Sequence, residues 1–155
     1  MNIPRNKTIQ ELFEWRFNKT PDLVAHKFQD RETTYGNLDK YSNQIANGLI
    51  SLNCKPDSRV AYYGKNSDHF FECLIGTLKS NTVTVGVNWR LAPPEVSYVL
   101  NDSQSEVLCV GEEFYPVIDQ ILDELPNIKT VIAIDGGSEK YQDFLSWRDS
   151  QDSSN

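Results

Sequence analysis

The sequence predicts an α/β protein with a mostly parallel β-sheet and helices on both faces. Four short apolar segments of strand length begin near Arg59, Thr82, Glu106 and Thr130, so that successive starts are 23, 24 and 24 residues apart. This spacing exceeds the dozen residues that a parallel crossover needs, and each gap carries a helical pattern of apolar residues. Alternating strands and helices favour right-handed crossovers and a sheet that is covered on both sides.

Helical and hairpin patterns precede the first of these strands. Thr8 and Glu11 stand at capping-box spacing, and the amphipathic helix that they begin ends at residues 18–21. Residues 24–28 and 33–35 predict a short hairpin. Thr34 is placed to cap a second helix, which ends at Cys54-Lys55-Pro56 and carries apolar residues every three to four positions: Leu38, Tyr41, Ile45, Leu49 and Leu52.

The gaps between the predicted strands hold three further helical segments, residues 70–78, 93–100 and 114–125. The third is the clearest amphipathic helix of the sequence and ends before Pro126. After the last strand, a turn at residues 135–137 leads to a short helical segment around Tyr141 and Trp147.

The length of 155 residues fits one domain with a sizeable core. We expect residues 1–148 to form an N-terminal α/β subdomain that is incomplete, and residues 149–155 to be a polar linker or a truncated end. Six of those last seven residues are Ser, Asp or Asn, which is typical of an unfolded segment. A linker in this position indicates a fragment of a longer protein.

Composition excludes several classes of protein. The 15 basic and 22 acidic side chains give a net charge of −7, opposite to the basic surface that nucleic acids require. Cys54, Cys73 and Cys109 form no Cys-x-x-Cys pair, so neither a disulfide scaffold nor a thiolate zinc site is indicated, and a cytoplasmic location fits best. The sequence contains neither a signal-peptide pattern nor an apolar run of membrane-spanning length.

One dipeptide, Gly64-Lys65, partly matches a phosphate-binding loop. Such a loop needs converging backbone N–H groups and a lysine that reaches the phosphates. Arg59 stands where the first glycine of that motif should be, and Asn66 stands where Ser or Thr should be. A turn between a strand and a helix explains the dipeptide better.

The neighbouring residues Ser67, Asp68 and His69 contain the residue types of a hydrolase triad. Adjacent residues cannot adopt triad geometry, because the base must face the nucleophile on one side and its orienting group on the other. A helix N-cap at Ser67 with a first-turn charge is the favoured interpretation. His26 is predicted to face outward from a strand, and two distant histidines make no metal site. We therefore assign no catalytic, cofactor-binding or metal-binding residue.

Several short motifs occur in a fixed order along the chain. The most specific is the run Val87-Asn88-Trp89-Arg90-Leu91, followed by Pro94-Glu95, Tyr98 and Leu100-Asn101-Asp102-Ser103. Before it stand Thr34-Tyr35 with Leu38, then Asp57-Ser58-Arg59-Val60-Ala61, and then Asn66-Ser67. In this order and spacing, over residues 8–134, the sequence resembles the N-terminal part of the adenylate-forming (AMP-binding) enzymes, in particular the fatty-acyl-CoA synthetases.

The resemblance implies that the parent protein is an acid–thiol ligase. Enzymes of this family activate a fatty or aromatic carboxylic acid with Mg·ATP, which gives an acyl-adenylate and pyrophosphate, and then transfer the acyl group to the thiol of coenzyme A. Their phosphate loop, Thr-Ser-Gly-Thr-Thr-Gly-x-Pro-Lys, has no match here, residues 136–138 being the nearest. We expect ATP, magnesium and coenzyme A to bind the parent enzyme but not this segment, which should be an inactive scaffold with a wall of the acyl pocket and part of a homodimer contact.

Three departures from the family pattern have local consequences. Asn37 replaces the usual Glu after Thr-Tyr, so the capping box there loses its reciprocal half. Asn81 stands where the family has a glycine in the left-handed conformation, which Asn tolerates. Asp57-Ser58 lacks the usual glycine, so a non-glycine residue must form that turn.

Two other classes of protein remain open on the sequence. One is a stand-alone flavodoxin-like domain that binds a small ligand at the carboxyl ends of its strands, in loops 64–68, 87–90 and 111–114. The other is a non-catalytic assembly domain that only makes protein contacts. For a fragment, we expect exposed apolar area on one side and self-association.

Overall fold

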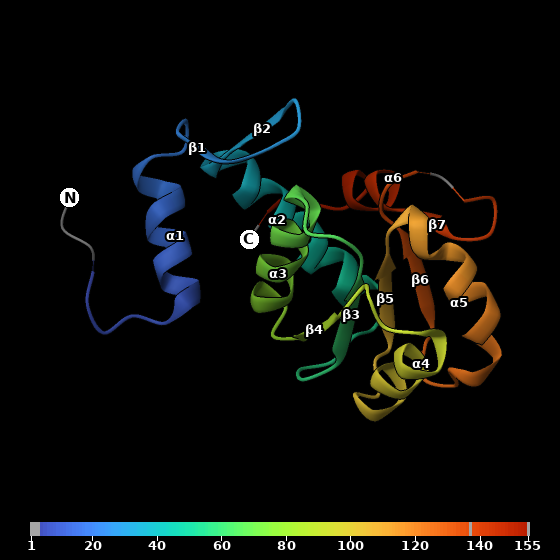
Figure 1. The fold of residues 1–155 in the computed structure, drawn as a ribbon. Coiled ribbons are helices and arrows are strands. Elements are labelled where there is room, and N and C mark those ends of the chain that lie inside the picture. Colours follow the sequence, from blue (N-terminus) through green and yellow to red (C-terminus); the bar gives the residue numbers. More distant parts are fainter. Residues whose placement is uncertain (1–3, 137, 155) are drawn as a thin grey trace.

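The computed structural model describes residues 4–136 and 138–154. A helix and a two-stranded hairpin precede a five-stranded parallel sheet that is packed between helices (Figure 1). The strands are β1 (Val24–Phe28), β2 (Arg31–Thr34), β3 (Arg59–Tyr63), β4 (Val83–Val87), β5 (Val107–Val110), β6 (Thr130–Ala133) and β7 (Gln142–Asp143). The α-helices are α1 (Ile9–Lys19), α2 (Tyr35–Ser51), α3 (Asp68–Lys79), α4 (Pro93–Asp102), α5 (Tyr115–Ile121) and α6 (Phe144–Asp149), and the 3₁₀ turns are η1 (Glu112–Phe114) and η2 (Leu122–Glu124).

The sheet confirms the predicted α/β class. Its strand order is β4-β3-β5-β6-β7, and each neighbouring pair runs parallel. The four predicted strands are β3 to β6, each within a residue of its expected start. The short edge strand β7 was not predicted, because two residues carry no alternating pattern that could be recognised.

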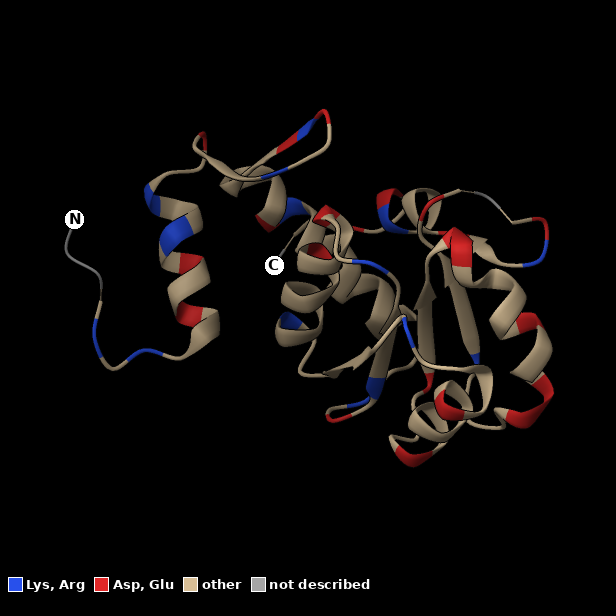
Figure 2. Ribbon diagram, in the orientation of Figure 1, with Lys and Arg blue, Asp and Glu red and all other residues tan. Residues whose placement is uncertain are grey.

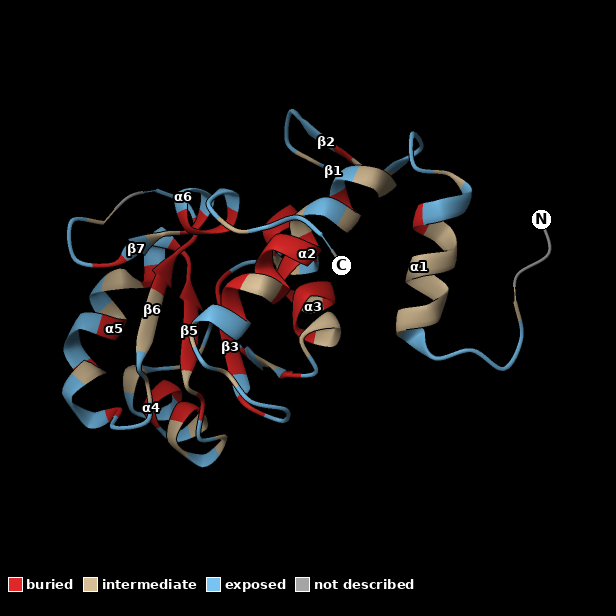
Figure 3. Cartoon of the chain, turned by 180° about the vertical axis from the view of Figure 1, so that it is seen from behind, coloured by how far each residue is buried: buried red, intermediate tan, exposed pale blue. Residues whose placement is uncertain are grey.

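The sheet has an apolar layer on each face, as predicted. Successive residues of a strand point to opposite faces, so Val60 and Tyr62 of β3 face one layer while Ala61 and Tyr63 face the other. Helices α2, α3 and α6 cover the first face, and α4 and α5 cover the second. Figure 3 shows the buried residues concentrated on the central strands and on the inner sides of these helices.

The hairpin and α1 pack against the α2–α3 side of the molecule (Figure 1). Phe17 of α1, Leu38 of α2 and Ile75 of α3 form a third apolar cluster. Lys79 lies beside it with a side chain that is only 3% exposed; its ammonium group pairs with Asp39 and lies over the ring of Phe17. Burying the charge is acceptable because the carboxylate and the aromatic ring both compensate it.

Helix ends follow the predicted caps with one exception. Thr8 and Glu11 form the complete capping box, and the Thr34 hydroxyl accepts a hydrogen bond from the N–H of Asn37, so only half of that box is present. Ser67 is the N-cap of α3 but makes no capping hydrogen bond. Its hydroxyl instead pairs with that of Tyr62 at 3.0 Å, so the predicted N-cap is correct in position but not in its bonding.

Two predicted turns use left-handed residues. Asn81 has φ of 57° and ends the α3–β4 connection, as expected for an Asn in place of glycine. Asp57 has φ of 68°, and its N–H donates to the carbonyl of Asn81 at 2.9 Å. The two left-handed turns therefore support each other next to the first residues of β3 and β4.

The single helix predicted over residues 114–125 is wrong in its continuity. The segment forms η1, α5 and η2 in succession. Pro116 lies in the first turn of α5, where a missing N–H is tolerated. The apolar pattern is satisfied all the same, because Phe114, Ile118 and Ile121 are buried in one layer.

Residues 151–154 lie along α2 instead of being unfolded. Side-chain amides of α2 donate hydrogen bonds to four main-chain carbonyls of this segment. Asn43 reaches Ser153, Gln44 reaches Gln151, and Asn47 reaches both Asp152 and Ser154, at 2.8 to 3.2 Å. We call residues 151–154 the tail. The polar linker is predicted to begin at Asp149, but this residue is the last residue of α6. None of the helices in the described part of the chain has the combined length and hydropathy of a membrane span.

Candidate functional site

The strand order creates a defined crevice at one edge of the sheet. From β3, the chain moves to β4 on one side and later to β5 on the other, so the direction of winding reverses between β3 and β5. In open parallel sheets, ligands bind in such a crevice, outside the carboxyl ends of the strands. Here the loops after Tyr63 and Val110 flank the crevice.

A cavity of about 390 Å³ lies at this position, and we call it the carboxyl-edge pocket. Three loops that follow β3, β5 and β6 contribute to it, and the β1–β2 hairpin closes one side. Its lining residues are Phe28, Gln29, Arg31, Lys65, Asn66, Ser67, Gly111, Glu112, Glu113, Phe114 and Asp135.

Two glycines let the loops approach closely at the base of the crevice. A Cβ atom on Gly64 would lie 3.6 Å from the backbone nitrogen of Gly111 and 3.3 Å from the Tyr62 ring. A Cβ atom on Gly111 would lie 3.2 Å from a carboxylate oxygen of Asp135. Glycine at both positions therefore keeps the two loops in contact and leaves room for the Asp135 carboxylate.

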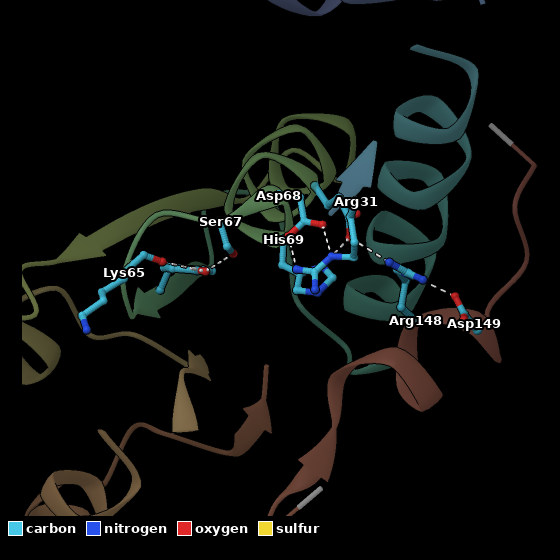
Figure 4. Close-up of polar contacts among 9 residues, drawn as sticks. Arg31, Lys65, Ser67, Asp68, His69, Arg148 and Asp149 are labelled. Atoms are coloured by element: carbon cyan, nitrogen blue, oxygen red, sulfur yellow. Dashed lines mark hydrogen bonds and ion pairs between the residues drawn. The ribbon is translucent and has the colours of Figure 1, made fainter. Parts of the chain in front are cut away.

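Both cationic side chains of the pocket already have carboxylate partners. Lys65 lies 2.7 Å from a carboxylate oxygen of Glu113 and also lies over the ring of Trp89. Arg31 makes two hydrogen bonds of 2.7 Å to Asp68, one to each carboxylate oxygen (Figure 4). The lining has more acidic than basic side chains, so it provides no free positive charge for a triphosphate.

The pKa values of two buried groups follow from these contacts. Burial alone would raise the pKa of Asp68, but the hydrogen bonds from Arg31 and the nearby positive charge outweigh it, and the pKa is lowered. Burial raises the pKa of Tyr62 far above its ordinary value, so its hydroxyl stays protonated. The two shifts therefore favour the carboxylate form of Asp68 and the neutral phenol of Tyr62.

A second polar cluster lies next to the pocket, and we call it the buried ion cluster: Asp68, His69, Glu72 and Arg148. One carboxylate oxygen of Glu72 lies 2.9 Å from Nη1 of Arg148 and 3.2 Å from Nδ1 of His69. Arg148 also donates to Asp149 and lies over the ring of Tyr41 at 3.9 Å. Figure 4 shows Arg148 reaching from α6 toward α3, so the cluster ties the two helices together.

The structure therefore brings together some of the residues that the sequence singled out. Residues 65–67 and 111–114, which belong to two of the three candidate ligand loops, line the carboxyl-edge pocket, whereas residues 87–90 do not. His69 contacts Glu72 and the ring of Phe144, not the Ser67 hydroxyl, so no triad forms. His26 lies on β1 beside the Phe71 ring.

Sequence reasoning missed the contributions of Arg31, Asp135, Glu72 and Arg148. Arg31 pairs with a residue 37 positions away, and Arg148 pairs with one 76 positions away. No local motif marks such pairs, because they depend on how the hairpin and α6 pack against α3. The acidic residues after β5 could be recognised in the sequence, and Figure 2 shows acidic residues on α4, on α5 and on the turns η1 and η2 that flank α5.

The family is defined by comparison with known proteins. The family described as AMP-binding enzyme matches residues 13–155, and the chain belongs to it. The chain is 36% identical over 148 residues to the fatty acid–[acyl-carrier-protein] ligase ScoC of Streptomyces coeruleorubidus, which is 96% of this chain and 27% of that protein. It is 29% identical to a medium/long-chain-fatty-acid–CoA/3-oxocholest-4-en-26-oate–CoA ligase of Mycolicibacterium smegmatis, over 88% of this chain and 25% of that protein.

Solved structures agree with the family and the fold. The anthranilate CoA ligase AuaEII in complex with anthranoyl-AMP superposes with a TM-score of 0.91 at 27% identity, over 100% of this chain and 31% of that one. The N-terminal domain of FACL13 from Mycobacterium tuberculosis gives 0.86 at 30% identity, over 96% of this chain and 37% of that one. The chain thus spans about a quarter of the length of its curated relatives, 27% and 25% in the two cases above.

Proposed function

We propose that the chain is the N-terminal part of an ATP-dependent acyl ligase. The parent enzyme converts a carboxylic acid and ATP to an acyl-adenylate and pyrophosphate, and then transfers the acyl group to the thiol of coenzyme A. The observation that carries this proposal is the family match over residues 13–155 together with the share of about a quarter of each relative. A cytoplasmic location and a fatty or aromatic acid substrate belong to the same proposal.

The residues of this chain do not fit the ATP·Mg group. In the carboxyl-edge pocket, Arg31 and Lys65 are both paired with carboxylates, so neither is free for phosphate oxygens. Within the part of the chain that the structure describes, no cluster of three His, Cys, Asp or Glu side chains could hold a metal ion. The role that we propose for this segment is a scaffold that supports the acyl pocket, with no step of the reaction on its own residues.

This proposal predicts that the 155-residue chain alone catalyses no ATP–pyrophosphate exchange. Bringing a carboxylate and a triphosphate together requires metal, lysine and converging N–H donors, which this segment does not provide. The measurement is exchange of labelled pyrophosphate into ATP with a panel of fatty and aromatic acids. The protein from the complete reading frame serves as the control and should exchange; exchange by the 155-residue chain above background would contradict the prediction.

The acyl acceptor has one alternative, the thiol of an acyl-carrier protein. It is favoured by the 36% identity to a fatty acid–[acyl-carrier-protein] ligase. Supplying the complete protein with acid, ATP and either acceptor distinguishes the two, because only the correct acceptor yields a thioester at a catalytic rate.

A small-ligand-binding domain of flavodoxin-like type is the second candidate function. Numbered along the chain, the parallel strands have the order 2-1-3-4-5, as in that class, and the carboxyl-edge pocket lies at its ligand position. Equilibrium dialysis of the 155-residue chain against flavin mononucleotide tests it. Saturable binding that is lost in Gly111→Leu, which fills the pocket, would support this candidate over the scaffold role.

A further inference from the structure

Strand β4 leaves one side of its backbone without a strand partner in the residues that the structure describes. It pairs with β3 on one side and forms the edge of the sheet on the other (Figure 1). The N–H of Val83 donates to the carbonyl of Ser58 at 2.9 Å, so the backbone groups of Val83 point toward β3. In a parallel pair the direction alternates along the strand, which directs the N–H and C=O groups of Thr84 and Gly86 outward.

This edge has none of the features that usually prevent strand pairing. Natural edge strands are protected by charged side chains, proline, bulges or very short length. The β4 segment is Val-Thr-Val-Gly-Val, and its register with β3 is continuous from Val83 to Val87. Val83 is 41% exposed, and a Cβ atom on Gly86 would meet no atom within 4 Å, so the sheet face over Gly86 is open.

The edge is complementary to itself. If two β4 strands pair antiparallel about an axis through Val85, Thr84 of each copy lies opposite Gly86 of the other. Both residues have outward N–H and C=O groups, so each Thr84–Gly86 pair exchanges two hydrogen bonds. On the face toward α3, the Thr84 side chain meets the open space over Gly86, and on the other face the two Val85 side chains meet.

We propose that β4 is a self-pairing edge through which two copies of this chain join into one continuous sheet, with the two-fold axis at Val85. A second copy fits because the strand offers uncharged, isologous pairing, whereas a charged peptide would find no opposite charge on it. One pair of short strands is a small interface, so the dimer is weak and depends on concentration. The inference uses only the edge present in this chain, and it therefore concerns the 155-residue polypeptide itself.

The first experiment removes one outward donor. Gly86→Pro deletes the outward N–H without touching the β3 ladder, and Gly86→Ala keeps that N–H as the matched control. Sedimentation equilibrium up to about 1 mM, the weak limit of specific association, should show a dimer for the native chain and for Gly86→Ala. We expect at least tenfold weaker association for Gly86→Pro, with unchanged circular dichroism showing that the variant is folded.

The second experiment tests the register and does not depend on the proline variant. In a Cys54→Ser background, Val85→Cys places two thiols opposite each other across the axis, where Cα atoms of a non-hydrogen-bonded pair lie about 4.5 Å apart. Val83→Cys is the control, because the register puts it opposite Val87. With copper–phenanthroline and air as oxidant, only Val85→Cys should give a disulfide-linked dimer. A native chain that stays monomeric at about 1 mM, or equally fast cross-linking of Val83→Cys, overturns the proposal.

Discussion

Gly48 lies where α2 packs directly against the indole of Trp147. A Cβ atom at this position would lie 2.5 Å from Cζ2 of that ring. We expect Gly48→Ala to lower the free energy of unfolding by about 1–3 kcal/mol, the usual cost of overpacking, even though alanine is the better helix former. Urea unfolding followed by circular dichroism measures it.

The matched control is Gly86→Ala, because a Cβ atom on Gly86 meets nothing within 4 Å. This substitution should leave the free energy of unfolding unchanged or slightly raise it. Equal stability of the two alanine variants would show that Trp147 can move away from α2 at little cost.

Asp68 makes part of the folding stability depend on pH. Its pKa is lower in the folded chain than in the unfolded chain, so its contribution is complete above the unfolded pKa of about 3.9 and is lost as the pH falls through the folded pKa. The difference in unfolding free energy between the native chain and Asp68→Asn should therefore be larger at pH 7 than at pH 3. Urea titrations at both values test this, and a difference that does not change with pH would contradict the role of the Arg31 pair.

At the scale of elements, Glu72 and Arg148 connect α3 to α6. Both side chains are nearly inaccessible, at 2% and 7% exposure, so Glu72→Gln leaves the Arg148 guanidinium without its buried counter-charge. We expect this substitution to lower the free energy of unfolding by about 3 kcal/mol or more. Lys140→Met, which breaks the exposed pair with Asp119, is the control and should cost less than about 1 kcal/mol. Similar losses for the two variants would mean that Arg148 finds sufficient compensation in Asp149 and Tyr41.

At the scale of the elements, the sequence predicts the features that depend on neighbouring residues and misses those that depend on the packing of distant segments. The strand spacing and the capping box at Thr8 depend on local rules, whereas the left-handed Asn81 was expected from the family resemblance, and the structure confirms all three. The helix predicted over residues 114–125 is divided into α5 and the turns η1 and η2. This division and the short strand β7 depend on tertiary packing that no local pattern encodes. The loops of the carboxyl-edge pocket were recognisable, since they follow predicted strands, whereas Arg31 and Arg148 reach their partners only after folding.

The aromatic residues illustrate the same limit. Most of the residues in one aromatic set stand at helical spacing with aliphatic residues, which predicts that the set belongs to the core and is not a stacking platform: Trp15, Phe17, Phe70, Phe71 and Trp89. Phe17 is buried, but Phe71 is 45% exposed, so that prediction is wrong for Phe71. It follows Phe70 on α3, and adjacent helical positions differ by about 100° around the axis, so both cannot face the sheet.

At the scale of the whole molecule, the chain has a core of its own. Apolar layers fill both faces of the sheet, and α6 completes one of them with Phe144 and Trp147. We therefore expect the 155-residue chain to unfold in a single cooperative transition although it covers about a quarter of its relatives. Tryptophan fluorescence and far-ultraviolet circular dichroism should give coincident thermal curves, and two separated transitions would contradict this.

The hydrogen bonds from α2 to the tail have a consequence for how residues 151–154 can change in evolution. The side-chain amides of Asn43, Gln44 and Asn47 donate to peptide carbonyls of the tail, which every amino acid carries. These four hydrogen bonds therefore do not depend on the identity of the tail side chains, and the path of the tail can persist when those side chains change. Selection should act instead on the three amide-bearing helix positions, where even a shift from amide to acid would replace a donor with repulsion toward the carbonyl oxygens.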